Sequence, residues 1–478
     1  MNSSANNLGT EKVRTLFWKL AIPTTVAQLV NLIYNMVDRI YLGRVENSEL
    51  AMSALAVSLP MITIIGAFTM LLGVGGAPIA AMKLGQKDSE GANRVLSTSF
   101  VCLTVVGVLL TTILLIFQKP ILMTFGASES NISLAMDYTG IYSLGTIFVL
   151  YAVGLNPFIN TQGKSHLGMA TVLIGAILNI ILDPIFIFGL DMGVKGAALA
   201  TIISQAVSAV WVMFFFFGGK SILLIKKVYF KPDFKIVFSI LALGVSPFIM
   251  SITESLLQVT FNNQLKLYGG TLAVGTMAIL ASLMQMLLLT TQGLAQGAQP
   301  IMSYNYGAGN LDRVRKAFRL LFIVAVSFSV ISVSIVTLFP RVFAGIFANE
   351  EPAISFASWA IRPYLMGGLL FGIQLSCQQS FLALGQAKPS LAMAILRKII
   401  LLIPLIYILP NLIGDWQIVQ TISQPVANMV EDPSRVFAVF AAESVADILA
   451  ALTTGTLFFF FYKKSLCKDL KTKEIEKA

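Results

Sequence analysis

The sequence predicts an all-α membrane protein with about twelve transmembrane helices, arranged as two pseudo-symmetric bundles of six. The first observation is composition, because 56% of the 478 residues are hydrophobic and only 12% are charged, against roughly 25% charged in a soluble domain. The second is that apolar stretches of membrane-spanning length recur along the whole chain. The third is a weak similarity between the two halves of the chain.

Each apolar stretch is long enough to cross about 30 Å of hydrocarbon at about 1.5 Å of rise per residue. The first six lie near residues 18–42, 53–82, 95–117, 134–160, 165–190 and 193–217. The second six lie near residues 237–265, 270–303, 317–346, 354–384, 389–413 and 434–462. A basic, polar stretch, KSILLIKKVYFKPDFK, separates the two sets. We therefore expect four regions: an N-terminal lobe (1–219), a cytoplasmic linker (220–236), a C-terminal lobe (237–462) and a basic cytoplasmic tail (463–478).

The Lys and Arg residues are unevenly distributed between the two sides of the predicted spans. With the N-terminus in the cytoplasm, 23 of the 33 lie on the cytoplasmic side, six on the opposite side and four within helices. An excess of basic residues marks the cytoplasmic side of multi-pass proteins. We therefore expect a multi-pass protein of the cell membrane with both termini in the cytoplasm. The net charge of +10 is then explained by topology rather than by nucleic-acid binding.

The similarity between the halves concentrates in their second helices. Shifting the sequence by 222 residues pairs Gly75 with Gly297, and Gly85 with Gly307. An even number of spans in each half gives both halves the same orientation, related by an axis along the membrane normal. Such a fold can hold a cavity between two bundles that opens alternately to either side of the membrane.

Two polar residues interrupt the fifth apolar stretch, TVLIGAILNIILDPIFIFGL. Asn179 and Asp183 are separated by one helical turn, so their side chains share a face of the helix. An ionisable group in the hydrocarbon costs at least ~2.5–3.5 kcal/mol, which favours a role in transport over a structural one. Pro184 has no N–H, so the carbonyl of Ile180 loses its usual donor. A carboxylate beside a freed carbonyl suits a proton, a hydronium ion or a small cation.

The first predicted helix carries a second polar face. Asn31, Tyr34, Asn35 and Asp38 follow one another at positions i, i+3, i+4 and i+7. The alternative for the amides is ordinary hydrogen bonding between helices, and it remains open. The same alternative applies to Thr201, whose hydroxyl lies near the start of the sixth helix.

The second half differs chemically from the first. A shift of 224 residues places Ile403 and Tyr407 opposite Asn179 and Asp183. The ion chemistry is therefore expected in the N-terminal lobe.

The second half has ionisable residues of its own. Glu254 lies within the seventh helix, Arg397 and Lys398 within the eleventh, and Glu443 and Asp447 one turn apart on the twelfth. By depth, Arg397 and Asp447 are expected to form a structural ion pair. Glu254 is a candidate contact for an ion or a substrate charge, and the structural alternative remains open.

Two methionines of the eighth helix are weaker candidates. Met284 and Met286 could line an adaptable apolar cavity, since methionine fills irregular spaces well. Ordinary packing is the alternative for both.

Three segments together resemble transporters of the multidrug and toxic compound extrusion (MATE) family. NIILDPIFIFGLDMGVKGAALATIISQ resembles the helix 5–6 signature, IPTTVAQLVNLIYNMVDRIYLG resembles helix 1, and YGAGNLDRVRKA resembles the loop after helix 8. The resemblance covers essentially the whole chain. It implies the MATE fold, with two six-helix lobes around a V-shaped cavity, and export of diverse, often cationic and lipophilic drugs in exchange for H+ or Na+.

The resemblance also implies a set of functional residues. It favours the DinF-like or MepA-like branch. The ion-coupling residues of the DinF-like branch match Tyr34, Asp38, Asn179, Asp183 and Thr201 in this sequence. It adds Asn31 and Asn156 as neighbours and Pro23 as the point where helix 1 bends. The NorM-like branch has a second cation site, and here Glu254 is present but its acidic partner in 359–386 is absent.

The sequence thus favours a cation-coupled antiporter without cofactor or metal, acting as a monomer in the lipid bilayer on small organic substrates. One rival is a lipid-linked oligosaccharide flippase of the same superfamily, which Arg397 and Lys398 leave open although about fourteen spans are typical there. Another is an intramembrane enzyme, but no HExxH motif and no Ser–His or Cys–His set occurs. We therefore expect no enzymatic activity and no nucleic-acid partner. The sequence does not distinguish H+ from Na+.

Overall fold

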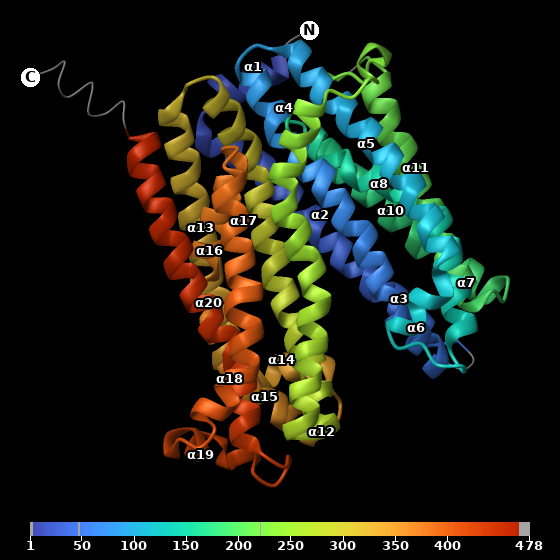
Figure 1. The fold of residues 1–478 in the computed structure, drawn as a ribbon, viewed down its shortest axis with the longest axis vertical. Helices are drawn as coiled ribbons and strands as arrows, with labels where there is room; N and C mark the ends of the chain where they lie inside the picture. Colours follow the sequence, from blue (N-terminus) through green and yellow to red (C-terminus); the bar gives the residue numbers. More distant parts are fainter. Residues whose placement is uncertain (1–2, 46–47, 220, 468–478) are drawn as a thin grey trace, which may run out of the picture. The chain divides into compact units, whose positions relative to one another are not determined.

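The fold is known from a computed structural model that describes residues 3–45, 48–219 and 221–467 (Figure 1). Within these ranges the chain is helical and contains no strand. Nine of the described helices are long and apolar enough to cross a membrane, or ten with a pair bent by 56°, Ile132–Leu144 and Thr146–Asn160. The predicted all-α membrane fold is therefore confirmed.

The difference from twelve predicted spans has a simple local origin. Helix α12 (Phe234–Gly307) is one element of 74 residues, although two spans were predicted there. Its backbone leaves helical geometry at Gly270, where φ is 63° and ψ is −155°, a conformation that favours glycine. The predicted span at 354–384 is interrupted by a 3₁₀ turn, Met366–Leu370, so neither of its helical pieces is long enough alone.

The contacts divide the chain into two compact units. Unit 1 comprises Met1–Ile252, Gln296–Val314 and Leu382–Ala387, and unit 2 comprises Thr253–Ala295, Arg315–Phe381 and Lys388–Ala478. The four expected regions were drawn from the apolar stretches and the basic segment between them, and they remain a prediction. Lys220 in the expected linker and residues 468–478 of the expected tail lie outside the described part of the chain.

Unit 1 is built mainly from the first eleven helices. These are α1 (Ser3–Thr10), α2 (Val13–Leu42), α3 (Ser48–Thr69), α4 (Gly75–Gly85), α5 (Ser89–Ile116), α6 (Gln118–Thr124), α7 (Ile132–Leu144), α8 (Thr146–Gly154), α9 (Asn156–Asn160), α10 (Ser165–Pro184) and α11 (Gly193–Phe217). Within this unit α10 packs along α2 and α11, and α7 packs against α3 and α11 (Figure 1). This packing places the two predicted polar helix faces in the same unit.

The repeat-related glycines occupy equivalent helix crossings in unit 1. A Cβ atom on Gly85 would lie 2.0 Å from the carbonyl oxygen of Tyr304, and one on Gly307 would lie 2.1 Å from that of Met82. A Cβ on Gly75 would lie 2.4 Å from the Ile240 carbonyl oxygen. Only glycine allows such close helix approach. The glycines that the 222-residue shift aligned are therefore required by packing.

The helices of unit 2 follow α12. They are α13 (Leu311–Leu338), α14 (Pro340–Phe347), α15 (Glu351–Leu365), α16 (Phe371–Ala383), α17 (Ala387–Ile395), α18 (Ile403–Ile413), α19 (Gln417–Ser423) and α20 (Pro433–Phe461). Helix α20 packs against α15 and α18 (Figure 1). A π-helical segment, Leu396–Leu402, joins α17 to α18. Phe356, Phe440 and Ile406 are fully buried in its apolar core.

Candidate functional site

Three of the predicted residues form one buried hydrogen-bonded group in unit 1. The Asn179 amide Nδ2 donates to Asp183 Oδ1 at 3.1 Å and to Thr201 Oγ1 at 3.3 Å. The Thr201 hydroxyl in turn donates to the carbonyl of Ala197 at 3.0 Å. Asn179 is 2% exposed and Asp183 is fully buried. The helical spacing of Asn179 and Asp183 brings them together, and α11 supplies the hydroxyl.

Some acceptor oxygens in and near this group accept no hydrogen bond. Asp183 Oδ2, Asn179 Oδ1 and, on α2, Asp38 Oδ1 are buried, and none of them has a hydrogen-bond partner in the described structure. All three atoms are acceptors, so a hydrogen-bond donor or a cation would satisfy them. Buried acceptors without partners are uncommon in folded proteins, and each invites an explanation.

Asp38 and Tyr34 belong to the same electrostatic environment as Asp183. The charge of Asp38 acts on Asp183, and both carboxylates lie within electrostatic range of the Tyr34 hydroxyl. No ion pair links Asp38 or Asp183 to a basic side chain in the described part of the chain. The five residues predicted to couple the ion are therefore gathered in one unit.

Two tyrosines near this group were missed by the sequence analysis. Tyr138 and Tyr142 on α7 are buried, and their rings stack with centroids 6.1 Å apart. Both lie within electrostatic range of Asp38 and Tyr34. The available signal was their i, i+4 spacing, which puts two polar-tipped aromatic side chains on one helix face.

The backbone changes its geometry next to the carboxylate. Helix α10 ends at Pro184, and a π-helical segment, Ile185–Gly189, follows directly. Proline removes one backbone donor, and π-helical turns are found frequently at functional sites. Asp183 therefore lies where the regular hydrogen-bond ladder of the helix is interrupted.

The remaining unit 1 candidates lie apart from the buried group or make contacts of their own. Asn35 Nδ2 donates to the carbonyl of Asn31 at 2.6 Å, so this pair is joined within α2. Asn156 donates to the carbonyl of Gly168 at 3.0 Å. Gly168 lies about three helical turns before Asn179 on α10. The structure therefore places Asn156 away from Asp183, because α9 packs against the start of α10.

Pro23 lies inside α2, which continues through it from Val13 to Leu42. The bend predicted at Pro23 remains a prediction.

The two methionines of the eighth predicted helix point to different surroundings. Met284 is 8% exposed and belongs to the core of unit 2, whereas Met286 is 54% exposed. Their spacing of two residues puts them on different faces of α12. Met284 is therefore a packing residue in this structure, and Met286 is the accessible one.

Unit 2 contains a buried network of ionisable side chains. Arg397 Nε donates to Asp447 Oδ1 at 2.8 Å, and Arg397 Nη2 lies 3.3 Å from Glu443 Oε1. The predicted ion pair between Arg397 and Asp447 is thus confirmed. Lys398 donates to Glu254, a contact that the sequence analysis did not predict.

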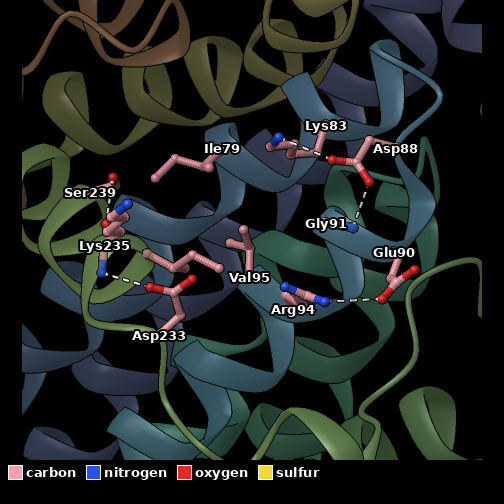
Figure 2. Close-up of a pocket in the computed structure, with 11 residues that line it drawn as sticks. Ile79, Lys83, Asp88, Glu90, Gly91, Arg94, Val95, Asp233, Lys235 and Ser239 are labelled. Atoms are coloured by element: carbon pink, nitrogen blue, oxygen red, sulfur yellow. Dashed lines mark hydrogen bonds and ion pairs between the residues drawn. The ribbon is translucent and has the colours of Figure 1, made fainter.

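A hollow of about 490 Å³ lies at the start of α12, in unit 1 (Figure 2). Lys83 pairs with Asp88 at 3.0 Å, and Arg94 pairs with Glu90 at 3.2 Å, as the close-up shows. Asp88 also accepts the N–H of Gly91 at 2.8 Å, which lowers the pKa of its carboxyl together with Lys83. Asp88 and Glu90 are therefore already paired with basic side chains of the same unit.

The segment between α11 and α12 is fastened to unit 1. The backbone N–H of Leu224 donates to Asn93 Oδ1 at 2.8 Å, and that of Ile222 donates to Gln162 Oε1 at 2.7 Å. Leu223 and Ile225 are buried in the adjoining core. This part of the expected linker is thus held by specific hydrogen bonds.

Fold and site together define a multi-pass all-α membrane protein with a group of buried carboxylate and amide oxygens in unit 1. The chain belongs to the MatE family, whose model matches residues 23–185 and 247–408. The two matched segments begin at Pro23 and Pro247, which are separated by the 224 residues of the internal repeat. The resemblance to MATE transporters is therefore confirmed.

The chain is similar to curated and solved members of this class. It is 29% identical over 395 residues to the multidrug export protein MepA of Staphylococcus haemolyticus (strain JCSC1435), covering 82% of this chain and 86% of MepA. A crystal structure of MATE in complex with MaL6 superposes with a TM-score of 0.87 at 21% identity, covering 98% of this chain and 100% of that one. A MOP superfamily transporter from Pyrococcus furiosus Vc1 (DSM3638) gives the same values.

Proposed function

We propose that this protein is a cation-coupled antiporter that exports diverse, often cationic and lipophilic drugs or toxic compounds by alternating access. The coupling ion is H+ or Na+, and the ion-coupling residues are Tyr34, Asp38, Asn179, Asp183 and Thr201. Family membership supports the transporter class, and the name of the similar MepA proteins supports drug export.

One observation carries the coupling proposal. Three buried acceptor oxygens, Asp38 Oδ1, Asn179 Oδ1 and Asp183 Oδ2, have no partner in the described structure. A proton on a carboxylate, or a bound cation, would satisfy this kind of group, whereas an anion would not. Two carboxylates within electrostatic range repel each other, so uptake of one positive charge is favoured.

The exchange would follow from neutralising this charge. With the ion bound, Asp183 and Asp38 lose the repulsion between them, and α2 and α10, which pack against one another, can adopt a different arrangement. The membrane potential contributes about 2.3 kcal/mol per charge for each 100 mV. That energy is sufficient to drive export against a concentration gradient.

The coupling ion can be identified by transport in proteoliposomes. Efflux of a fluorescent organic cation would be followed with a pH gradient alone, with a Na+ gradient alone and with neither. One gradient should accelerate efflux in the wild type. Equal efflux under all three conditions contradicts the proposal of coupled transport.

The flippase alternative receives no specific support. Arg397 and Lys398, which left it open, are paired with Asp447 and Glu254 in unit 2. They therefore do not present free positive charge to an anionic lipid headgroup.

We propose that the transporter has no enzymatic activity and uses no cofactor or resident metal besides the coupling ion. We further propose that the protein acts as a monomer in the cell membrane with both termini in the cytoplasm. Its partners would be the lipid bilayer and small organic substrates, with no nucleic acid.

A further inference from the structure

Five ionisable side chains lie together in unit 2 with unequal numbers of acids and bases. Arg397 and Lys398 carry two positive charges, and Glu254, Glu443 and Asp447 carry three negative charges when ionised. Four of the five side chains are at most 8% exposed, but that of Glu254 is 66% exposed. With all five groups ionised, the network has one negative charge in excess, and Glu254 is its only exposed member.

Arg397 and Lys398 contact different acidic residues of this network. Arg397 holds Asp447 at 2.7 Å through Nη2 and reaches Glu443 at 3.3 Å, so Glu443 is the more loosely held acid. Lys398 donates to Glu254, while Glu443 and Asp447 are close enough for their charges to act on it. A buried ammonium with a second acid nearby can leave its first partner without becoming an isolated buried charge.

The backbone provides this arrangement through a local irregularity. Arg397 and Lys398 are adjacent in sequence, yet they are only 3% and 4% exposed. Both belong to the π-helical segment Leu396–Leu402, which widens the turn inside a membrane-spanning helix. Phe371 packs on the Arg397 guanidinium at 5.1 Å from its ring centroid and helps to fix it. The rigid residue is thus Arg397, and the flexible four-carbon stem belongs to Lys398.

We propose that the Lys398 ammonium is a tethered occupant of the Glu254 carboxylate, and that the positive charge of a transported organic cation displaces it toward Glu443. This proposal rests on the proposed function, because it assumes that organic cations are substrates. An arriving organic cation replaces the Lys398 ammonium beside Glu254, and Lys398 then compensates Glu443. A neutral compound cannot make this exchange, so Lys398 contributes to substrate specificity.

The test measures binding rather than transport. Tetraphenylphosphonium is a suitable probe because its positive charge is permanent, and its binding to the purified full-length protein can be followed by isothermal titration calorimetry. Lys398→Met removes the competitor and should tighten binding about tenfold. Glu254→Gln should weaken binding about tenfold. In the Glu254→Gln background, Lys398→Met should no longer tighten binding.

A second variant covers the case in which Lys398→Met does not fold. Glu443→Gln removes the acid that would receive Lys398, while Arg397 keeps Asp447, so tetraphenylphosphonium should bind about tenfold more weakly. Lys388→Met is the matched control, because it removes one exposed positive charge from the start of α17 and should leave binding unchanged.

The proposal is overturned if the wild type and Lys398→Met fail to bind the probe. It is also overturned if Lys398→Met tightens binding equally with and without Glu254, or if Glu443→Gln binds like the wild type. Efflux in proteoliposomes is measured separately. Ion-driven efflux with unchanged binding in these variants would overturn the tethered-occupant proposal and leave the antiporter proposal standing. The predicted binding pattern without ion-driven efflux would overturn the antiporter proposal and leave the tethered-occupant proposal standing.

Discussion

The two units surround the carboxylates of their helices in opposite ways. In unit 1, Asp183 accepts from an amide, and no described ion pair supplies a positive charge to it or to Asp38. In unit 2, Asp447 is paired with Arg397, and Glu254 is paired with Lys398. Unit 2 thus pairs its carboxylates with basic side chains, whereas the described part of unit 1 pairs neither Asp38 nor Asp183 with one.

The physical reason for the contrast is the cost of burying charge. An isolated carboxylate in a low-dielectric interior is strongly unfavourable unless it is paired, hydrogen-bonded or protonated. Arg397 removes this cost permanently for Asp447, and that makes a carboxylate useless for exchanging ions. Asp183 has no basic partner in the described structure, and under the proposed function this cost is relieved when the coupling ion binds.

The largest expected effect tests the unit 1 side of the comparison. Asp183→Asn and Asp38→Asn each remove a negative charge but keep the size of the side chain. Ion-driven efflux in proteoliposomes should fall to the background of empty vesicles in both variants. The matched control is Asp137→Asn, which removes a carboxylate of α7 that is paired with Lys195 at 3.3 Å and partly exposed. Wild-type efflux in either Asp183→Asn or Asp38→Asn would disprove the assignment of the coupling site.

The second prediction concerns stability in unit 2. Arg397→Met leaves Asp447 and Glu443 buried without their cation, and breaking a buried ion pair typically costs about 3–5 kcal/mol. Thermal unfolding in detergent should show a large loss of stability.

Arg341→Met is the control for Arg397→Met. It breaks an exposed pair with Glu351, which should contribute at most about 1 kcal/mol. If both arginine variants unfold at the same temperature, the unit 2 network is not a structural counterpart to the site of unit 1.

Much of this contrast could be predicted from the sequence, since it depends on local spacing. One helical turn separates Asn179 from Asp183, and the hydrogen bond between them follows directly. The depth of Arg397 and Asp447 in their helices likewise predicted their ion pair. Helix packing along α2 and α10 then brought Asp38 into electrostatic range of Asp183.

Other parts could not be predicted because they depend on how particular helices pack. The contact between Lys398 and Glu254 needs the π-helical segment, which changes the directions of consecutive side chains and leaves no clear sequence pattern. The approach of Tyr138 to Asp38 depends on the position of α7. Asn156 was expected near the ion site, but its position is set by the crossing of α9 and α10 at Gly168.

A moderate effect is expected for Asn179, which holds Asp183 without carrying charge. Asn179→Ala removes the donor to Asp183 Oδ1 and to Thr201 Oγ1. A buried hydrogen bond to a charged group contributes about 1.5–3 kcal/mol. Its loss disfavours the ionised carboxylate, so the ion concentration for half-maximal efflux should shift about tenfold or more, downward if the coupling ion is H+.

Thr201→Ser is the control for Asn179→Ala, because it keeps the hydroxyl that accepts from Asn179. A lower maximal rate with unchanged dependence on the coupling ion would show that Asn179 acts on a later step than ion binding.

The smallest effect is expected for a carboxylate outside the membrane, where water competes for the charge. Asp88 caps α5 through the Gly91 N–H and pairs with Lys83, and these contacts lower its pKa below the usual value near 4. Because the folded-state pKa is lowered, the ionised group stabilises the fold above about pH 4, and this contribution is lost as the pH falls through the folded-state pKa.

Asp88→Ala should cost about 1 kcal/mol at pH 7, mainly by removing the cap, and the difference from wild type should shrink in unfolding measurements at pH 3. Asp88→Asn keeps a capping oxygen but removes the charge, so it distinguishes the contribution of the cap from that of the charge. If the Asp88→Ala difference is the same at both pH values, the charge of this exposed carboxylate contributes nothing. Asp88 and Asp183 would then differ in the role of their charge as well as in burial, because only the buried carboxylate would need its charge to act.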